Sequence, residues 1–143
     1  MDVKASDIKI ALAKRHKNEF FITECKTGPT QLGAGLLIFD GLAIYKSWTT
    51  PKIAGYEIKV SRSDFQRDVK YARYMQYCHE FSFVVPTGLI KREEVEPEIG
   101  LIYYNPDKRA LITKRKAVYR PVPIDSDLLM YIFMNRLESD RMR

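Results

Sequence analysis

The sequence has few of the features that mark membrane or secreted proteins. Its longest apolar run, from Gly33 to Ile44, is interrupted by Asp40 and is shorter than the roughly 20 residues that a membrane-spanning helix needs. Charged residues break up residues 1–14, so this stretch lacks the apolar core of a secretory signal. We therefore expect a cytoplasmic protein that is not inserted in a membrane.

Cysteine and histidine are also scarce, with two of each in the chain. Cys25 and Cys78 lie far apart and have neither a CxxC partner nor a histidine at zinc-ligand spacing, so we predict buried, reduced thiols rather than a structural zinc site. His16 and His79 are isolated in the sequence. This pattern gives little support to a histidine-metal centre or to a His-Cys catalytic pair.

The composition is that of an ordinary globular protein, with 45% hydrophobic and 29% charged residues. No internal repeat, low-complexity tract or flexible linker divides the chain, so residues 1–143 are expected to form a single domain. The net charge of +6 favours a polyanionic partner. Many basic proteins bind no nucleic acid, so the charge needs the support of a recognisable site.

Hydrophobic periodicity and turn residues predict the α/β class, with a mixed sheet flanked by helices. Helices are expected at residues 5–17, 62–78 and 125–140, and strands at residues 19–26, 36–46, 53–60, 81–85, 100–104 and 110–116. The core order is α-β-β-β-α-β, followed by a hairpin and a C-terminal helix. A capping-box pattern at residues 61–64 starts the second helix.

The strongest candidate site comes from the strand at residues 53–60, where alternation places Glu57 and Lys59 on one face. Asp40 lies seventeen residues before Glu57, late in the preceding strand, so a hairpin of the two strands brings the carboxylates together. Mg²⁺ prefers oxygen ligands and often takes only one or two carboxylates from the protein. Such an ion activates water and stabilises developing charge in phosphodiester hydrolysis, with Lys59 in support.

The same E-x-K triplet occurs a second time as Glu24-Cys25-Lys26, so the triplet alone identifies no site. Asp7 precedes that copy by the same seventeen residues, but it falls at a predicted helix start and cannot pair across a hairpin. Context therefore favours the Glu57 copy. The alternative interpretation of Asp40, Glu57 and Lys59 is a surface ion-pair cluster, which would contribute no more than about 1 kcal/mol.

Two segments carry a resemblance to a known family: F-D-G-L-A-I at residues 39–44 and G-Y-E-I-K-V-S-R-S-D-F at residues 55–65. They are similar to the core of the MmcB-like DNA repair proteins, which belong to the PD-(D/E)XK nuclease superfamily. The similarity extends from about residue 20, through residues 23–24 and 84–86, to residues 100–102. One departure is Phe39, which stands before Asp40 where the superfamily motif has proline.

The resemblance implies a restriction-endonuclease-like core in which Asp40 and Glu57 hold Mg²⁺ or Mn²⁺. The backbone carbonyl of Ile58 is implied as a further ligand. Lys59 is implied to orient or activate the attacking water. The resemblance thus assigns a catalytic role to each residue that the strand pattern had singled out.

Two further catalytic residues are implied by the same resemblance. The superfamily often has an extra acid on its first helix, and here Glu24, on the first strand, is preferred to Asp7 for a place at or near the metal. A polar residue on the helix after the lysine often assists catalysis, and Gln66 is the candidate.

One face of the helix predicted from residue 62 is polar and is the expected nucleic-acid-binding surface. Its members, which fall within one arc at 100° per residue, are Arg62, Gln66, Lys70, Arg73 and Tyr77. The basic residues would hold the phosphate backbone, and Tyr74 or Tyr77 would stack on bases. The alternative is an ordinary solvated helix face.

A second basic cluster surrounds the predicted hairpin, and it would either grip DNA or keep an edge strand soluble. It consists of Lys108, Arg109, Lys114, Arg115, Lys116 and Arg120. Trp48, in the loop between the two active-site strands, would either contact a base or cap the core.

The function that these residues favour is a metal-dependent DNA nuclease acting in repair or recombination. The alternatives are a nuclease-fold protein that binds nucleic acid without cutting it, and a scaffold that recruits repair partners. DNA is the expected partner in the first two, and a homodimer or a repair complex is also compatible with the sequence. A metal-free binding surface would gain nothing from two carboxylates facing a phosphate, which favours the nuclease.

Overall fold

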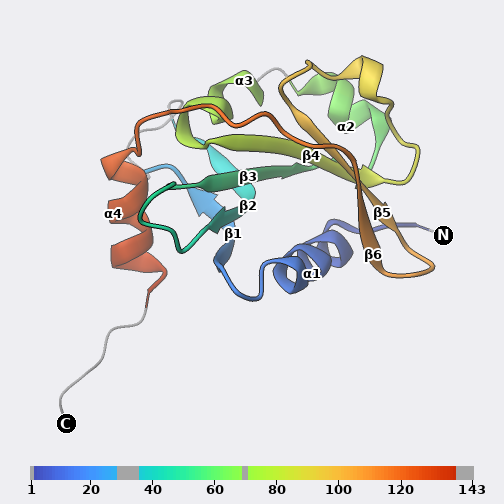
Figure 1. The fold of residues 1–143 in the computed structure, drawn as a ribbon. Helices are drawn as coiled ribbons and strands as arrows, with labels where there is room; N and C mark the ends of the chain where they lie inside the picture. Colours follow the sequence, from blue (N-terminus) through green and yellow to red (C-terminus); the bar gives the residue numbers. More distant parts are fainter. Residues whose placement is uncertain (1, 29–35, 69–70, 138–143) are drawn as a thin grey trace, which may run out of the picture.

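The computed structural model describes residues 2–28, 36–68 and 71–137. In these residues, six strands form one sheet in the order β1-β2-β3-β4-β5-β6 (Figure 1). The strands are β1 (Phe20–Lys26), β2 (Ile38–Ile44), β3 (Ile53–Ile58), β4 (Glu80–Pro86), β5 (Gly100–Asn105) and β6 (Ala110–Arg115). Neighbouring strands pair in parallel at β3–β4 and β4–β5 and antiparallel elsewhere, including the predicted β5–β6 hairpin. The predicted mixed α/β architecture is confirmed.

Helices cover both faces of the sheet (Figure 1). The helix α1 (Ala5–Arg15) lies against one face, where its buried Ile8 and Leu12 pack with apolar residues of β2 to β5. The short helices α2 (Arg62–Arg67) and α3 (Tyr71–Tyr74) lie over the opposite face, and α4 (Ser126–Asn135) lies at the β1 end of the molecule. In the described part of the chain, no helix is both long and apolar enough to cross a membrane.

The single long helix predicted from residue 62 to about residue 78 is wrong. The helix α2 ends at Arg67, and Asp68 has an extended backbone with φ −75° and ψ 106°. After the break come α3 and a 3-10 turn at Met75–Tyr77. The polar stripe predicted along one continuous helix therefore does not exist as a single face.

Aromatic packing on Phe83 explains the break. The rings of Phe65 and Tyr71 both meet Phe83 edge-on, with centroid distances of 5.4 and 5.8 Å. In one continuous helix, side chains six residues apart point roughly 120° apart and could not both reach one ring. Burying both rings on the sheet therefore requires the chain to leave the helix between them, and Asp68 lies in that interval.

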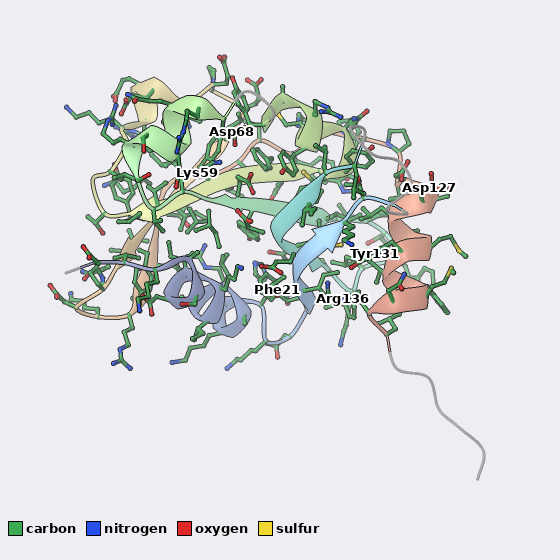
Figure 2. The ribbon with its side chains drawn as sticks, turned by 180° about the vertical axis from the view of Figure 1, so that it is seen from behind. Phe21, Lys59, Asp68, Asp127, Tyr131 and Arg136 are labelled. Carbon is green, nitrogen blue, oxygen red and sulfur yellow. The ribbon has the colours of Figure 1, made fainter. Side chains whose placement is uncertain are left out.

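The C-terminal helix begins as predicted but ends earlier. Asp125 caps α4 by accepting the backbone N–H of Leu128 at 3.0 Å. The helix ends at Asn135, and Arg136 then donates to the carbonyl oxygen of Thr23 at 2.9 Å, which ties the helix end to β1 (Figure 2). The part of the predicted helix beyond residue 137 lies outside the described residues.

Phe39 fixes the part of β2 that carries Asp40. Its ring lies over Gly55 of β3 and meets the ring of Tyr74 edge-on, with centroids 4.9 Å apart. A Cβ atom at Gly55 would overlap with the Phe39 ring, so this close approach requires glycine. The ring thereby joins β2, β3 and α3 immediately beside the candidate site.

Cys25 and Cys78 are free and fully buried, as predicted. Burial raises the pKa of both thiols to about 12. Both sulfurs therefore stay protonated at neutral pH and act as small core side chains.

Candidate active site

Asp40 and Glu57 lie where the pairing of β2 with β3 ends. Gly41 pairs with Tyr56, and the next contact between the strands is made by a side chain, with Oδ2 of Asp40 accepting the N–H of Ile58 at 2.7 Å. The carboxyl group of Glu57 lies within hydrogen-bonding reach of Asp40. The hairpin expected from the sequence therefore does bring the two acids together.

Glu57 is a buried acid with poor compensation for its charge. Its relative exposure is only 8%, and its Oε1 atom has no hydrogen-bond partner among the described residues. Burial, followed by the hydrogen bond and negative charge of Asp40, raises the pKa of the Glu57 carboxyl well above its usual range, although Lys59 acts in the opposite direction. This oxygen is the kind of orphaned buried acceptor that a bound cation or a proton would satisfy.

Lys59 follows directly after β3, and its backbone N–H donates to the carbonyl of Val84 at 3.1 Å. Its Nζ lies 3.8 Å from Oε2 of Glu57 and 3.0 Å from Oδ2 of Asp68. Glu57 and Lys59 thus project to the same side, as the strand alternation predicted. The ammonium group is shared between two acids rather than paired with Glu57 alone.

Asp68 is a site residue that the sequence reasoning missed. Only 5% of its side chain is exposed, and it reaches back from the end of α2 to Lys59 (Figure 2). No spacing motif selects it, because it lies nine positions after Lys59 and the contact depends on the helix break. No sequence signal selects it, because the helix break depends on the tertiary packing of Phe65 and Tyr71 on Phe83.

These side chains form the wall of an open cleft of about 360 Å³ between the end of β3 and α2. The residues that line the cleft are Glu57, Ile58, Lys59, Asp64, Arg67, Asp68 and Tyr74. Arg67 stands at the rim with 74% of its side chain exposed and pairs with Asp64 at 2.8 Å. The cleft therefore combines acids, cations and access from solvent.

The structure does not bring Glu24 or Gln66 into this cleft. Glu24 lies on β1 with a positive φ of 49°, and its carboxylate, 69% exposed, pairs with Lys9 of α1 at 3.0 Å. The Glu24 side chain is thus directed to α1 and does not line the cleft, and its expected approach to the metal stays a prediction. Gln66 is exposed on α2 and does not line the cleft, because Asp64, Arg67 and Asp68 face it instead.

The residues expected to bind nucleic acid are dispersed. Arg62 pairs with Glu94 at 2.6 Å and donates to the carbonyl of Leu89 at 2.7 Å, so much of its hydrogen-bonding capacity is used within the protein. Arg73 is exposed on α3, and Tyr77 lines a separate cavity beside residues 122–126. Lys70 lies outside the described residues.

The second basic cluster is partly structural. Arg115 donates to the carbonyl oxygens of Ile99 at 3.1 Å and Glu96 at 2.8 Å, and Arg120 donates to that of Cys78 at 2.9 Å. These contacts hold loops and are not available to a phosphate. Trp48 is fully exposed, which excludes the expectation that it caps the core.

The oxygen donors fit a hard divalent cation better than a transition metal. Within residues 2–28, 36–68 and 71–137, no group of three or more His, Cys, Asp or Glu side chains is placed to hold a metal ion. Asp40 and Glu57 provide two carboxylates, and Oε1 of Glu57 has no partner in the described ranges. Two carboxylates suit Mg²⁺, which keeps several waters, whereas a zinc site needs three or four protein ligands.

Comparison with known proteins places the fold but not the function. No protein-family model and no curated protein matches the sequence. A solved structure of the SPO1766 protein of unknown function from Silicibacter pomeroyi is similar, with a TM-score of 0.66 and 20% sequence identity over 93% of this chain and 84% of that chain. At this identity the similarity establishes a shared fold alone.

Proposed function

We propose that this protein is a metal-dependent deoxyribonuclease with a restriction-endonuclease-like core of the PD-(D/E)XK type. The observation that carries the proposal is the buried Glu57, which lies against Asp40. One of its carboxylate oxygens has no partner among the described residues, and Lys59 Nζ lies 3.8 Å from the other. The strand order and the helices on both faces are compatible with such a core.

Energetics supports a site rather than a surface ion-pair cluster. A buried acid that is close to a second acid is destabilising unless a proton or a cation compensates for it. An ordinary ion-pair cluster would lie on the surface with its charges balanced, but Glu57 is buried and its pKa is raised. An arrangement that is costly for folding is typical of a functional site.

In this proposal, Asp40 and Glu57 would hold Mg²⁺ or Mn²⁺, with the backbone carbonyl of Ile58 as a further donor. When bound, the ion would supply an activated water and stabilise negative charge on the phosphoryl group. Lys59 would orient that water and add positive charge beside the scissile phosphate. The hydrogen bond from Ile58 N–H to Asp40, 2.7 Å long, holds one carboxylate in place before any ligand arrives.

DNA is the proposed substrate because the overall positive charge of the protein favours a polyanionic partner. The net charge is +6, and Lys59 and Arg67 both line the cleft. Arg67 is exposed, so its pairing with Asp64 can be exchanged for a phosphate at little cost. Exposed Trp48 lies beyond the other end of β2, so it is not part of this proposal.

The test is a cleavage assay with Mg²⁺ and Mn²⁺ on single-stranded, duplex, flap and junction DNA. Asp40→Ala and Lys59→Ala should each lower cleavage by at least about 100-fold while DNA binding persists. Asp64→Asn is the matched control, since Asp64 lines the same cleft but pairs with Arg67, and it should keep its activity within about threefold.

Absence of cleavage on all four substrates, together with absence of metal binding by calorimetry, would overturn the proposal. Metal-independent DNA binding without cleavage would instead identify a nuclease-fold protein that only binds nucleic acid.

A further inference from the structure

The helix break after α2 places the carboxylate of Asp68 in the wall of the cleft. Asp68 follows the helix with an extended backbone, and only 5% of its side chain is exposed. Its Oδ2 lies 3.0 Å from Nζ of Lys59, which is itself only 15% exposed. Two oppositely charged, largely buried groups at this distance form an ion pair that solvent and salt screen less than an exposed pair.

Lys59 contacts two acids at unequal distances. Its Nζ lies closer to Asp68, at 3.0 Å, than to Glu57, at 3.8 Å. A lysine side chain has a flexible four-carbon stem with several rotatable bonds, so a defined position of its ammonium group requires a contact that holds it. Glu57 is the second acid in contact with Lys59, so it is the group to which the ammonium would turn if Asp68 were removed.

We propose that Asp68 is a positioning residue, which holds Lys59 beside the two acids while keeping its ammonium group from closing onto Glu57. The value of this arrangement for catalysis rests on the proposed nuclease function, whereas the arrangement itself does not. Asp68 acts through Lys59 and is not assigned any contact with substrate.

The first experiment follows the Lys59 side chain in the metal-free protein, so it needs no activity. With ¹³C-labelled lysine, the two ε-methylene protons of a held side chain give separate NMR signals, and those of a mobile one merge. Lys59→Arg assigns the signal by its loss. We expect separate Lys59 signals in the wild-type protein and merged signals, at the position of the exposed lysines, in Asp68→Asn.

Two variants make this result specific. Asp64→Asn removes a different acid of the same cleft, one that pairs with Arg67, and should leave the Lys59 signals unchanged. Asp68→Glu restores the carboxylate and should restore at least part of the separation. It also provides a test if Asp68→Asn does not fold. Merged signals in the wild-type protein, or separate signals that survive in Asp68→Asn, would overturn the proposal.

The second experiment uses cleavage at saturating metal. Asp68→Asn should lower kcat by about 10- to 100-fold with KM changed less than about threefold, because positioning is lost and binding is not. In a Lys59→Ala background, the same substitution should cause no further loss, since residues that act as a unit are not additive. A further loss in that background would show that Asp68 acts independently of Lys59 and would overturn the proposal.

The two experiments separate the two proposals. If the wild-type protein cuts no DNA, the proposed function fails, and the NMR measurement alone still decides whether Asp68 positions Lys59.

Discussion

Two regions of the molecule bury polar side chains, and they differ in whether the buried polar atoms have hydrogen-bond partners. In the histidine region, His79 Nδ1 accepts the N–H of Ile53 at 2.9 Å, and its ring stacks on Tyr119 with centroids 5.2 Å apart. His16 lies between the hydroxyl of Tyr56, at 2.7 Å, and the carboxylate of Glu19, at 3.0 Å. Both ring nitrogens of His16 therefore have partners.

The cleft presents the reverse situation. In the part of the chain that the structure describes, one oxygen of Glu57 has no partner, a second acid lies beside it, and the ammonium group of Lys59 lies closer to Asp68 than to Glu57. The histidines, which are common catalytic residues, are satisfied parts of the core. Burying the acids of the cleft costs folding free energy that the surrounding residues do not recover. Such an uncompensated acid indicates a functional site better than a histidine whose hydrogen bonds are all made.

The largest effect is expected from breaking the satisfied region. His79→Ala should lower the free energy of unfolding by about 2–3 kcal/mol, because it leaves the buried N–H of Ile53 without an acceptor and removes the ring from Tyr119. Chemical denaturation measures this loss. His79→Asn is the control, since its amide oxygen can replace Nδ1 as acceptor, and it should lose clearly less. Equal losses in the two variants would show that the hydrogen bond contributes little.

A smaller effect of opposite sign is expected in the cleft. Glu57→Gln should stabilise the metal-free protein by about 1–2 kcal/mol, because a neutral amide removes the repulsion from Asp40 and the cost of burying an acid. The matched control is Asp64→Asn, which removes an exposed acid whose pKa is lowered by its hydrogen bond from Arg67, and which should not stabilise the protein.

Adding a divalent cation to the same two proteins tests whether Glu57 takes part in metal binding. Mg²⁺ should raise the thermal stability of the wild-type protein, since a ligand that binds only the folded state stabilises it, and should raise that of Glu57→Gln far less. A Glu57→Gln protein that is less stable than wild type without metal would contradict the view that the acid is costly.

The strands and the paired acids could be predicted because their signals are local. Alternation places Glu57 and Lys59 on one side, and the hairpin of β2 and β3 then needs only a short connection to bring Asp40 beside them. The coarse α/β architecture follows from the same periodicity. The likeness to a nuclease core stays a prediction, since the solved structure that shares the fold has no known function.

Tertiary contacts decided what the sequence could not show. The capping box at Ser61 did start a helix, but aromatic packing on Phe83 ended it after Arg67. Asp68 was missed for this reason, and the expected stripe from Arg62 to Tyr77 failed with it. The position of Glu24 was likewise set by a positive φ and by Lys9, neither of which leaves a pattern in the sequence.

The smallest effect is a pH dependence that isolates the histidine region. Burial lowers the pKa of both His16 and His79 in the folded protein. Below about pH 6.5, the ordinary pKa of histidine, the unfolded chain therefore binds protons more readily than the folded one. Their contribution is therefore fully present above about pH 6.5 and is lost as pH falls through the lowered pKa values of the folded state. The free energy of unfolding therefore rises with pH between the lowered pKa values and about pH 6.5.

The measurement is best made in the Glu57→Gln protein, where the cleft acid no longer titrates. Urea denaturation between pH 7.5 and 5.5 should show a loss of about 1 kcal/mol toward the acidic end, within the limit of about 1.4 kcal/mol per pH unit for each group. Adding His79→Asn should reduce the slope and leave the part due to His16. A slope that is unchanged by His79→Asn would mean that folding does not lower the pKa of His79, contrary to its acceptance of the Ile53 N–H, which requires a neutral ring.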